Sequence, residues 1–138
     1  YGALKIALSY PENYGYCCSI ASGCLFLSKL MEDFKKGEFK SVYDSQMLKD
    51  FESAFGKELD VGDNNEILSL AQKAQSSLNK PRIYSICGKN DPLLNDNNKF
   101  ANEMQKLNFE FTYEEIDGNH DWFFFNNALK RSIDFIFD

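Results

Sequence analysis

Residues 82–121 constrain the fold of this chain more than any other stretch. An apolar run at residues 82–87 is followed by a Gly/Asn turn that leads to Asp91, and a later strand-like run ends shortly before His120. In open α/β sheets the carboxyl ends of parallel strands meet at one edge, where ligands bind and reacting groups gather. We therefore expect Asp91 and His120 to lie close together at such an edge.

Helical and strand-like patterns alternate along the chain. Apolar residues recur at helical intervals in four segments, residues 1–10, 67–78, 96–107 and 122–136. Three short runs are typical of strands: residues 16–21, predicted to be central, residues 82–87, and residues 109–116, predicted to lie half-exposed near an edge. This alternation predicts an α/β fold with a mostly parallel sheet flanked by helices. Three strands are too few to close such a core, so further strands are expected from elsewhere.

Residues 24–80 are the least regular part and are expected to form a helical insert or cap. Short helices are predicted around residues 27–34 and 47–55, and their aromatic side chains are assigned to a small core of their own in preference to a ligand cage. The chain has the length of one domain, which we divide into residues 1–23, 24–80 and 81–138.

Two local patterns predict how helices begin and pack. Asp63 and Glu66 have the spacing of a capping box ahead of the helix at residues 67–78. The last helix is expected to pack on the sheet through one apolar stripe: Trp122, Phe125, Leu129, Ile133 and Ile136. Trp122 is therefore assigned to core packing in preference to a substrate pocket.

The composition argues against several classes of function. The formal net charge is −6 and no basic run occurs, which argues against nucleic acid as a partner. No window approaches about 18 consecutive apolar residues, so no membrane span is expected. With one histidine and no Cys-x-x-Cys pair, no metal site is expected, and the cysteines are predicted to be buried free thiols: Cys17, Cys18, Cys24 and Cys87.

His120 is the only histidine, so any imidazole acid/base chemistry falls on it. Asp91 is the candidate to accept the Nδ1–H of that ring, as the acid of a Ser-His-Asp triad does, although Asn-Asp-Pro is also a turn sequence. Three other carboxylates are rivals with structural alternatives: Asp96 as a helix cap together with Asn95, Asp117 at a strand end, and Asp121 as the cap of the last helix.

No convincing nucleophile occurs among the 138 residues. The elbow that exposes a catalytic serine reads Gly-x-Ser-x-Gly, and no serine has that frame; Ser22 is followed by Gly23 but lacks the first glycine. Cys87 lies within a predicted strand and is expected to be buried and unreactive. The chain opens on Tyr1 with residues that suit a fold interior, so we expect the carboxyl-terminal part of a longer protein.

Three motifs resemble one family. Tyr1-Gly2-Ala3-Leu4 resembles the helix that follows the Gly-x-Ser-Met-Gly-Gly elbow in the Putative esterase family of α/β-hydrolases, which includes tributyrin-esterase-like enzymes and feruloyl and acetyl-xylan esterases. Cys87-Gly88-x-x-Asp91 and Gly118-x-His120-Asp121-Trp122 are similar to later landmarks of that family, as are residues 19–23. The resemblance touches nearly the whole chain and is weakest over residues 24–63.

The resemblance implies the carboxyl-terminal portion of an α/β-hydrolase fold and a serine carboxylesterase. Asp91 corresponds to the triad acid and His120 to the general base, while the serine and the preceding strands would lie upstream of Tyr1. The isolated chain is then expected to be inactive. No cofactor or metal is implied.

The resemblance also bears on partners and alternatives. The implied substrate is a small-molecule ester or an acylated sugar, and a complementing amino-terminal segment or a homo-oligomer would cover the sheet. Two alternatives stay open: a non-catalytic α/β-hydrolase-like binding module, and a thioesterase similar to S-formylglutathione hydrolases, which more often carry His at the position of Tyr1. A cytoplasmic location is favoured, although a leader would lie outside this sequence.

Overall fold

A three-stranded parallel sheet forms the centre of the molecule. The computed structural model describes residues 1–38 and 45–137. The strands are β1 (Tyr16–Ile20), β2 (Arg82–Gly88) and β3 (Phe111–Ile116), in the order β1-β2-β3. Cys17 pairs with Ile83, and Ile83 pairs with Phe111 on its other side. The predicted α/β fold is confirmed, and β3 lies at an edge as predicted. In the described residues β1 lies at the opposite edge, whereas a central position was predicted.

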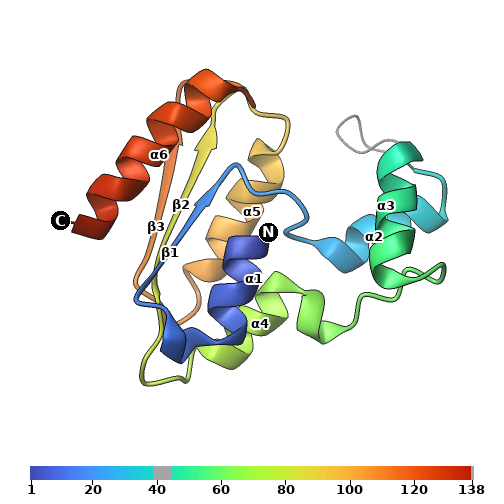
Figure 1. The fold of residues 1–138 in the computed structure, drawn as a ribbon, viewed down its shortest axis with the longest axis horizontal. Coiled ribbons are helices and arrows are strands. Elements are labelled where there is room, and N and C mark those ends of the chain that lie inside the picture. Colours follow the sequence, from blue (N-terminus) through green and yellow to red (C-terminus); the bar gives the residue numbers. More distant parts are fainter. Residues whose placement is uncertain (39–44, 138) are drawn as a thin grey trace.

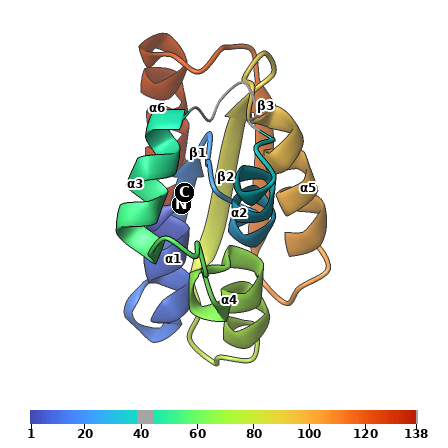
Figure 2. The ribbon, with the colours of Figure 1, turned by 90° about the vertical axis from the view of Figure 1, so that its right-hand side faces the viewer.

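Helices cover both faces of the sheet. On one face lie α1 (Gly2–Ser9), α4 (Ile67–Ala74) and α5 (Leu94–Met104), and on the other lies α6 (Trp122–Phe137) (Figures 1 and 2). The first face is closed by apolar side chains that include Leu4, Ile67, Ile83 and Phe100, all buried. Every residue of β2 after Arg82 is buried, which is why its sequence is mostly apolar and does not alternate between apolar and polar residues.

The remaining two helices, α2 (Leu27–Lys35) and α3 (Ser45–Phe55), stand on the side of α1 and α5 that faces away from the sheet (Figure 1). Their buried apolar residues pack with those of neighbouring segments into a separate group, here called the insert cluster: Leu27, Leu30, Met31, Phe34, Leu59, Val61 and Leu93. Phe51 packs against this cluster, with its ring 5.5 Å from that of Phe34. The prediction that these aromatic side chains form a core of their own is confirmed.

The predicted capping box at the start of α4 is wrong. Residues Asp63–Asn65 form a short 3₁₀ helix, and Glu66, in extended conformation, precedes α4 without a side-chain cap. The Glu66 carboxylate instead accepts the backbone N–H of Ser28, at the start of α2. Its carboxylate is therefore used to join two helices and is not available to its own. Leu78, predicted on the apolar face of this helix, lies beyond its end and is fully exposed.

Two further cap predictions have opposite outcomes. The cap of α5 is Leu93, so neither Asn95 nor Asp96 serves as its cap, and both lie within the first turn. Asp121 does cap the last helix, since its Oδ1 accepts the backbone N–H of Phe124 at 2.9 Å.

The predicted packing face of α6 is wrong for three of its five residues, Trp122, Leu129 and Ile133. The buried residues of this helix are Phe124, Ala128 and Ser132. Trp122 is 84% exposed, and Leu129 and Ile133 are 52% and 46% exposed. The helix is held in this rotation by Phe124, which packs against Gly118, and by a 3.0 Å ion pair between Arg131 and Glu114 of β3. Leu129 and Ile133 consequently face away from the three strands, whereas Phe125 is partly buried and packs against the core on this side of the sheet.

The four cysteines are free thiols, as predicted; Cys17 and Cys87 are buried, and Cys18 and Cys24 are partly buried. Among residues 1–38 and 45–137, no helix has both the length and the apolar character required to span a bilayer.

The packing of α6 gives a stability prediction. Phe124→Ala should lower the free energy of unfolding of the chain by about 3–5 kcal/mol, because it empties a buried site between the helix and Gly118. Leu129→Ala should cost about 1 kcal/mol or less, because that side chain is half exposed here. Urea unfolding followed by circular dichroism measures both, and equal losses would contradict the observed rotation of α6.

Candidate functional site

Asp91 and His120 lie in contact, as the sequence predicts. The Nδ1 atom of His120 is 2.8 Å from Oδ2 of Asp91. The two residues follow neighbouring parallel strands, β2 and β3, whose last paired residues are Gly88 and Ile116. Both loops therefore leave the sheet at the same edge, side by side.

Two glycines bring these loops together. A Cβ added to Gly88 would lie 2.5 Å from the carbonyl oxygen of Gly118, so only glycine fits this close approach. Gly118 has φ +155°, and a Cβ there would meet Phe124 at 2.9 Å. The backbone N–H of Lys89 donates to Ile116 O at 2.9 Å, and that of Asn90 donates to Gly118 O at 3.0 Å. Gly88 and Gly118 are turn positions in the sequence, but the pattern of turn residues does not reveal this contact.

Asp91 is held by its own turn. Its backbone carbonyl accepts the N–H of Leu94 at 3.0 Å, and its Oδ1 accepts the N–H of Leu93 at 2.8 Å. Its side chain is completely buried. Each carboxylate oxygen thus has one partner, Leu93 N–H for Oδ1 and the His120 ring for Oδ2, which a buried carboxylate requires.

The His120 ring is placed for proton transfer at its far side. Its side chain is 44% exposed, and its ring meets that of Phe125 edge-on, with centroids 4.9 Å apart. The carboxylate of Asp91 favours the tautomer with the proton on Nδ1, which leaves Nε2 as a base. No hydrogen bond to Nε2 is made from the part of the chain that the structure describes. The pair can accept a proton at Nε2 and stabilise the resulting imidazolium.

The three rival carboxylates have other partners. Asp96 pairs with Lys99 at 3.8 Å, Asp117 pairs with Lys89 at 3.0 Å, and Asp121 caps α6. Asp117 is also 91% exposed. Of the carboxylates in the described residues, Asp91 is the one bonded to His120.

The described residues present no nucleophile to this pair. The hydroxyl groups of Ser19 and Ser85 are bonded to each other at 2.6 Å within the sheet, and Ser22 is buried. Cys87 is fully buried, and burial together with the nearby charge of Asp91 raises the pKa of its thiol to about 12. A thiol with such a pKa is not a thiolate at neutral pH, so Cys87 is unreactive as predicted.

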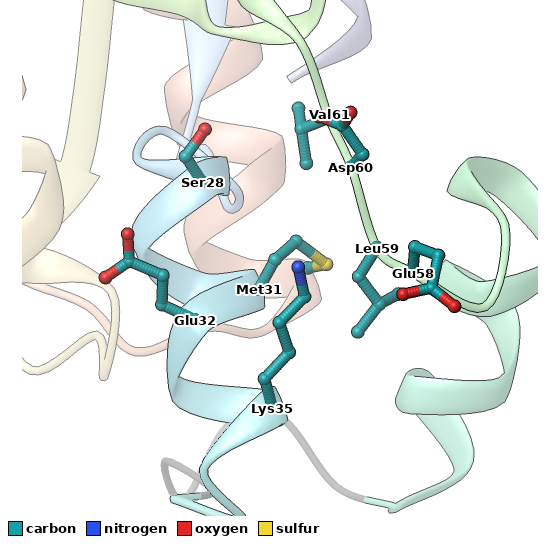
Figure 3. A pocket seen from close by; sticks show the side chains of 8 residues that line it. All are labelled: Ser28, Met31, Glu32, Lys35, Glu58, Leu59, Asp60 and Val61. Atoms are coloured by element: carbon teal, nitrogen blue, oxygen red, sulfur yellow. The ribbon is translucent and has the colours of Figure 1, made fainter.

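A separate hollow of about 370 Å³ lies in the insert, between α2 and residues 58–61 (Figure 3). Neither Asp91 nor His120 lines it. Its walls combine the apolar side chains of Met31, Leu59 and Val61 with charged ones. Residues 1–38 and 45–137 contain no group of three or more His, Cys, Asp or Glu residues that could hold a metal ion.

The chain is similar to proteins described as esterases. The family model described as Putative esterase matches residues 1–136. An acetyl esterase of Caldicellulosiruptor saccharolyticus is 25% identical over 138 residues, which are 99% of this chain and 50% of that protein. The chain spans about half the length of the curated relative that it matches.

Two solved structures share the fold. The S-formylglutathione hydrolase of Staphylococcus aureus has a TM-score of 0.77 and 22% identity, covering 100% of this chain and 50% of that one. The fluorophosphonate-binding serine hydrolase F of the same organism, with substrate bound, has a TM-score of 0.77 and 24% identity over the same shares.

The contact between the two glycines gives a prediction for the site. Gly88→Ala should push the loop of His120 away from Asp91, because its Cβ has no room beside Gly118 O. In ¹⁵N spectra of the purified chain, the neutral ring of His120 should change from mainly Nδ1-protonated to a mixture of both tautomers. Gly2→Ala is the control, since a Cβ there meets nothing within 4 Å. An unchanged ring in Gly88→Ala would show that the glycine contact does not position the pair.

Proposed function

The chain belongs to the Putative esterase family of α/β-hydrolases, and we propose that the whole protein is a serine carboxylesterase in which Asp91 and His120 are two members of a Ser-His-Asp triad. The observation that carries this proposal is the 2.8 Å contact between Nδ1 of a half-exposed histidine and a completely buried carboxylate. In a surface ion pair the acid can stay exposed. In a Ser-His-Asp triad the acid is buried and bonded to Nδ1, where it holds the ring and stabilises the imidazolium.

The proposed reaction proceeds in two steps. A serine Oγ attacks the ester carbonyl carbon while its proton passes to Nε2 of His120. The same proton then passes to the oxygen of the leaving alcohol, and an acyl-serine remains. A water oxygen then attacks the acyl carbon while losing a proton to Nε2; the acyl–Oγ bond breaks, the proton passes from Nε2 to serine Oγ, and the carboxylic acid leaves. Asp91 stays ionised throughout and orients the ring.

The fold supports a position for the missing serine. The crossovers from β1 to β2 and from β2 to β3 both pass over the face that carries α4 and α5, and α1 lies on that same face (Figure 1). Because parallel crossovers are right-handed, a parallel strand preceding α1 would pair with the other side of β1. Tyr1 packs against the insert cluster, which contains Leu93, two residues from Asp91. The segment that leads into Tyr1 would therefore lie at the edge that carries the pair.

The exposed side of α6 supports the same arrangement. Arg131 reaches over β3 to Glu114, and Cys18 of β1 donates its thiol hydrogen to the carbonyl of Ser132 at 3.7 Å. The flank of α6 beyond Ser132, which bears Leu129 and Ile133, therefore points past β1 and away from β3. Tyr14 and Tyr16, 41% and 38% exposed, continue this apolar surface at the β1 side. We propose that the upstream half of the protein covers it.

An acetyl or similarly small oxygen ester is the proposed substrate class. The acetyl esterase to which the chain is similar supports this choice, and so does Tyr1, where thioester-cleaving relatives more often carry His. The likeness to an S-formylglutathione hydrolase keeps thioesters as the second candidate. Turnover of p-nitrophenyl acetate against S-formylglutathione separates the two, and failure of a fluorophosphonate to label the whole protein would favour the non-catalytic binding module.

Removal of either site residue should abolish turnover in the whole protein. His120→Ala and Asp91→Asn should each lower kcat for p-nitrophenyl acetate by about 10⁴- to 10⁶-fold, because the serine loses its base or the base loses its orientation. The thermal midpoint of each variant shows whether the fold survives. The isolated chain should hydrolyse nothing above background.

Asp117→Asn is the matched control, because Asp117 is an exposed carboxylate on the same loop as His120 and pairs with Lys89. It should retain kcat within about threefold of the parent, since surface changes of this kind cost little. Near-parental activity of His120→Ala, or a loss in Asp117→Asn as large as in Asp91→Asn, would refute the assignment of the site.

The proposed contact of α6 with the upstream half gives another prediction. Leu129→Asp should destabilise the whole protein by about 2 kcal/mol or more, because it would bury a charge, yet leave the stability of the isolated chain nearly unchanged. Asn127→Asp, on the exposed polar flank of the helix, should be nearly neutral in both. Urea unfolding of both variants and the parent, each as the whole protein and as the isolated chain, provides the comparison. A neutral Leu129→Asp in the whole protein would show that the upstream half does not cover Leu129.

A further inference from the structure

Leu93 contacts both the insert cluster and the turn that carries Asp91. Its side chain is 6% exposed and belongs to the insert cluster, whose other members come from α2 and residues 59–61. Its backbone N–H donates to Oδ1 of Asp91 at 2.8 Å. We propose that Leu93 is a positioning residue, through which the packing of the insert fixes the carboxylate that orients His120. Its catalytic meaning rests on the function proposed above.

The backbone geometry explains how the side chain of Leu93 can control its N–H. Leu93 has φ −89° and ψ −1° and is the third residue of a turn closed by the bond from Leu94 N to Asp91 O. Pro92 precedes it with a fixed φ, and the bond from Leu94 N to Asp91 O closes the turn, so the turn that carries this N–H is restricted. Displacement of the Leu93 side chain therefore moves this N–H relative to Asp91.

The other side of Leu93 is anchored to α5. Its carbonyl accepts the side-chain amide of Asn97 at 2.9 Å, and the same amide donates to Ser22 O at 3.0 Å. Asn97 is 2% exposed. The carbonyl side of the residue is thus held by the body of the fold, whereas its side chain is held by the insert, so only the second support depends on how the insert is packed.

The insert cluster is open to change. Met31, Leu59 and Val61 line the hollow between α2 and residues 58–61 (Figure 3). Each of them also belongs to the insert cluster, which holds Leu93. The helices α2 and α3 have no strand beneath them, since they stand beyond α1 and α5 (Figures 1 and 2). Repacking of this region would reach Asp91 through Leu93 without moving the sheet.

The consequence for the site is a looser carboxylate. If the N–H of Leu93 withdraws, Oδ1 of Asp91 is buried without a partner, which is unfavourable, and the carboxylate rotates to find one. Oδ2 then leaves Nδ1 of His120, and the neutral ring no longer prefers the Nδ1-protonated tautomer.

The test measures the tautomers of the His120 ring in the ¹⁵N-labelled chain, at a pH at which the ring is neutral. His120 is the only histidine, so its signals need no assignment. Leu93→Ala should lower the ratio of Nδ1- to Nε2-protonated ring at least threefold, and Leu93→Met should restore it. Leu8→Ala is the matched control, since Leu8 is 2% exposed but lies in the other core. Leu30→Ala, which loosens the insert cluster without altering Leu93, should also lower the ratio.

Each outcome decides the inference. A ratio in Leu93→Ala equal to that in Leu8→Ala would overturn it, and if Leu93→Ala does not fold, the ratio in Leu30→Ala decides alone. In the whole protein, Leu93→Ala should lower kcat for p-nitrophenyl acetate by about 10- to 100-fold with KM unchanged. An inactive parent protein would refute the proposed function and leave the ring measurement valid. An active parent with an insensitive ring would refute this inference only.

Discussion

The approach of Gly88 to the carbonyl of Gly118 is the contact on which the candidate site depends. Parallel pairing of β2 with β3 brings the two loops to one edge of the sheet, but pairing alone leaves their separation open. With no Cβ at Gly88, the loops come close enough for Asn90 to donate to Gly118 O. Asp91 follows on one loop and His120 on the other, so the distance between their side chains is set by backbone contact and not by side-chain flexibility.

A buried carboxylate is costly unless both of its oxygens have partners, and Asp91 meets this requirement from two directions. One partner is the ring of His120, and the other is the backbone of its own turn. That turn contains Leu93, whose side chain packs in the insert cluster. In this arrangement the insert does more than cover an edge of the sheet, because part of the support of the acid comes from it.

The contact between Asp91 and His120 could be predicted from the sequence because the relevant rules are local. Asp91 and His120 each follow a strand-like run and a glycine turn, and parallel strands deliver such turns to one edge. The strands and the helices at residues 27–34 and 47–55 were predicted for the same reason. Glu66 could not be predicted in this way, because its carboxylate bonds Ser28, 38 positions away, and a capping-box pattern contains no information about such a competitor.

The last helix was misassigned for a different reason, which also explains its composition. It has two apolar faces: one carries Phe124 and Ala128 against the three strands, and the other carries Trp122, Leu129 and Ile133. Helical periodicity identifies a stripe but cannot say which layer it meets when two stripes are present. The stripe chosen from the sequence includes the three residues that the strands leave exposed, together with Phe125, which is partly buried against the core. A helix that is apolar on two sides is typical of one packed between two layers, which agrees with the proposal that the upstream half of the protein covers the second side.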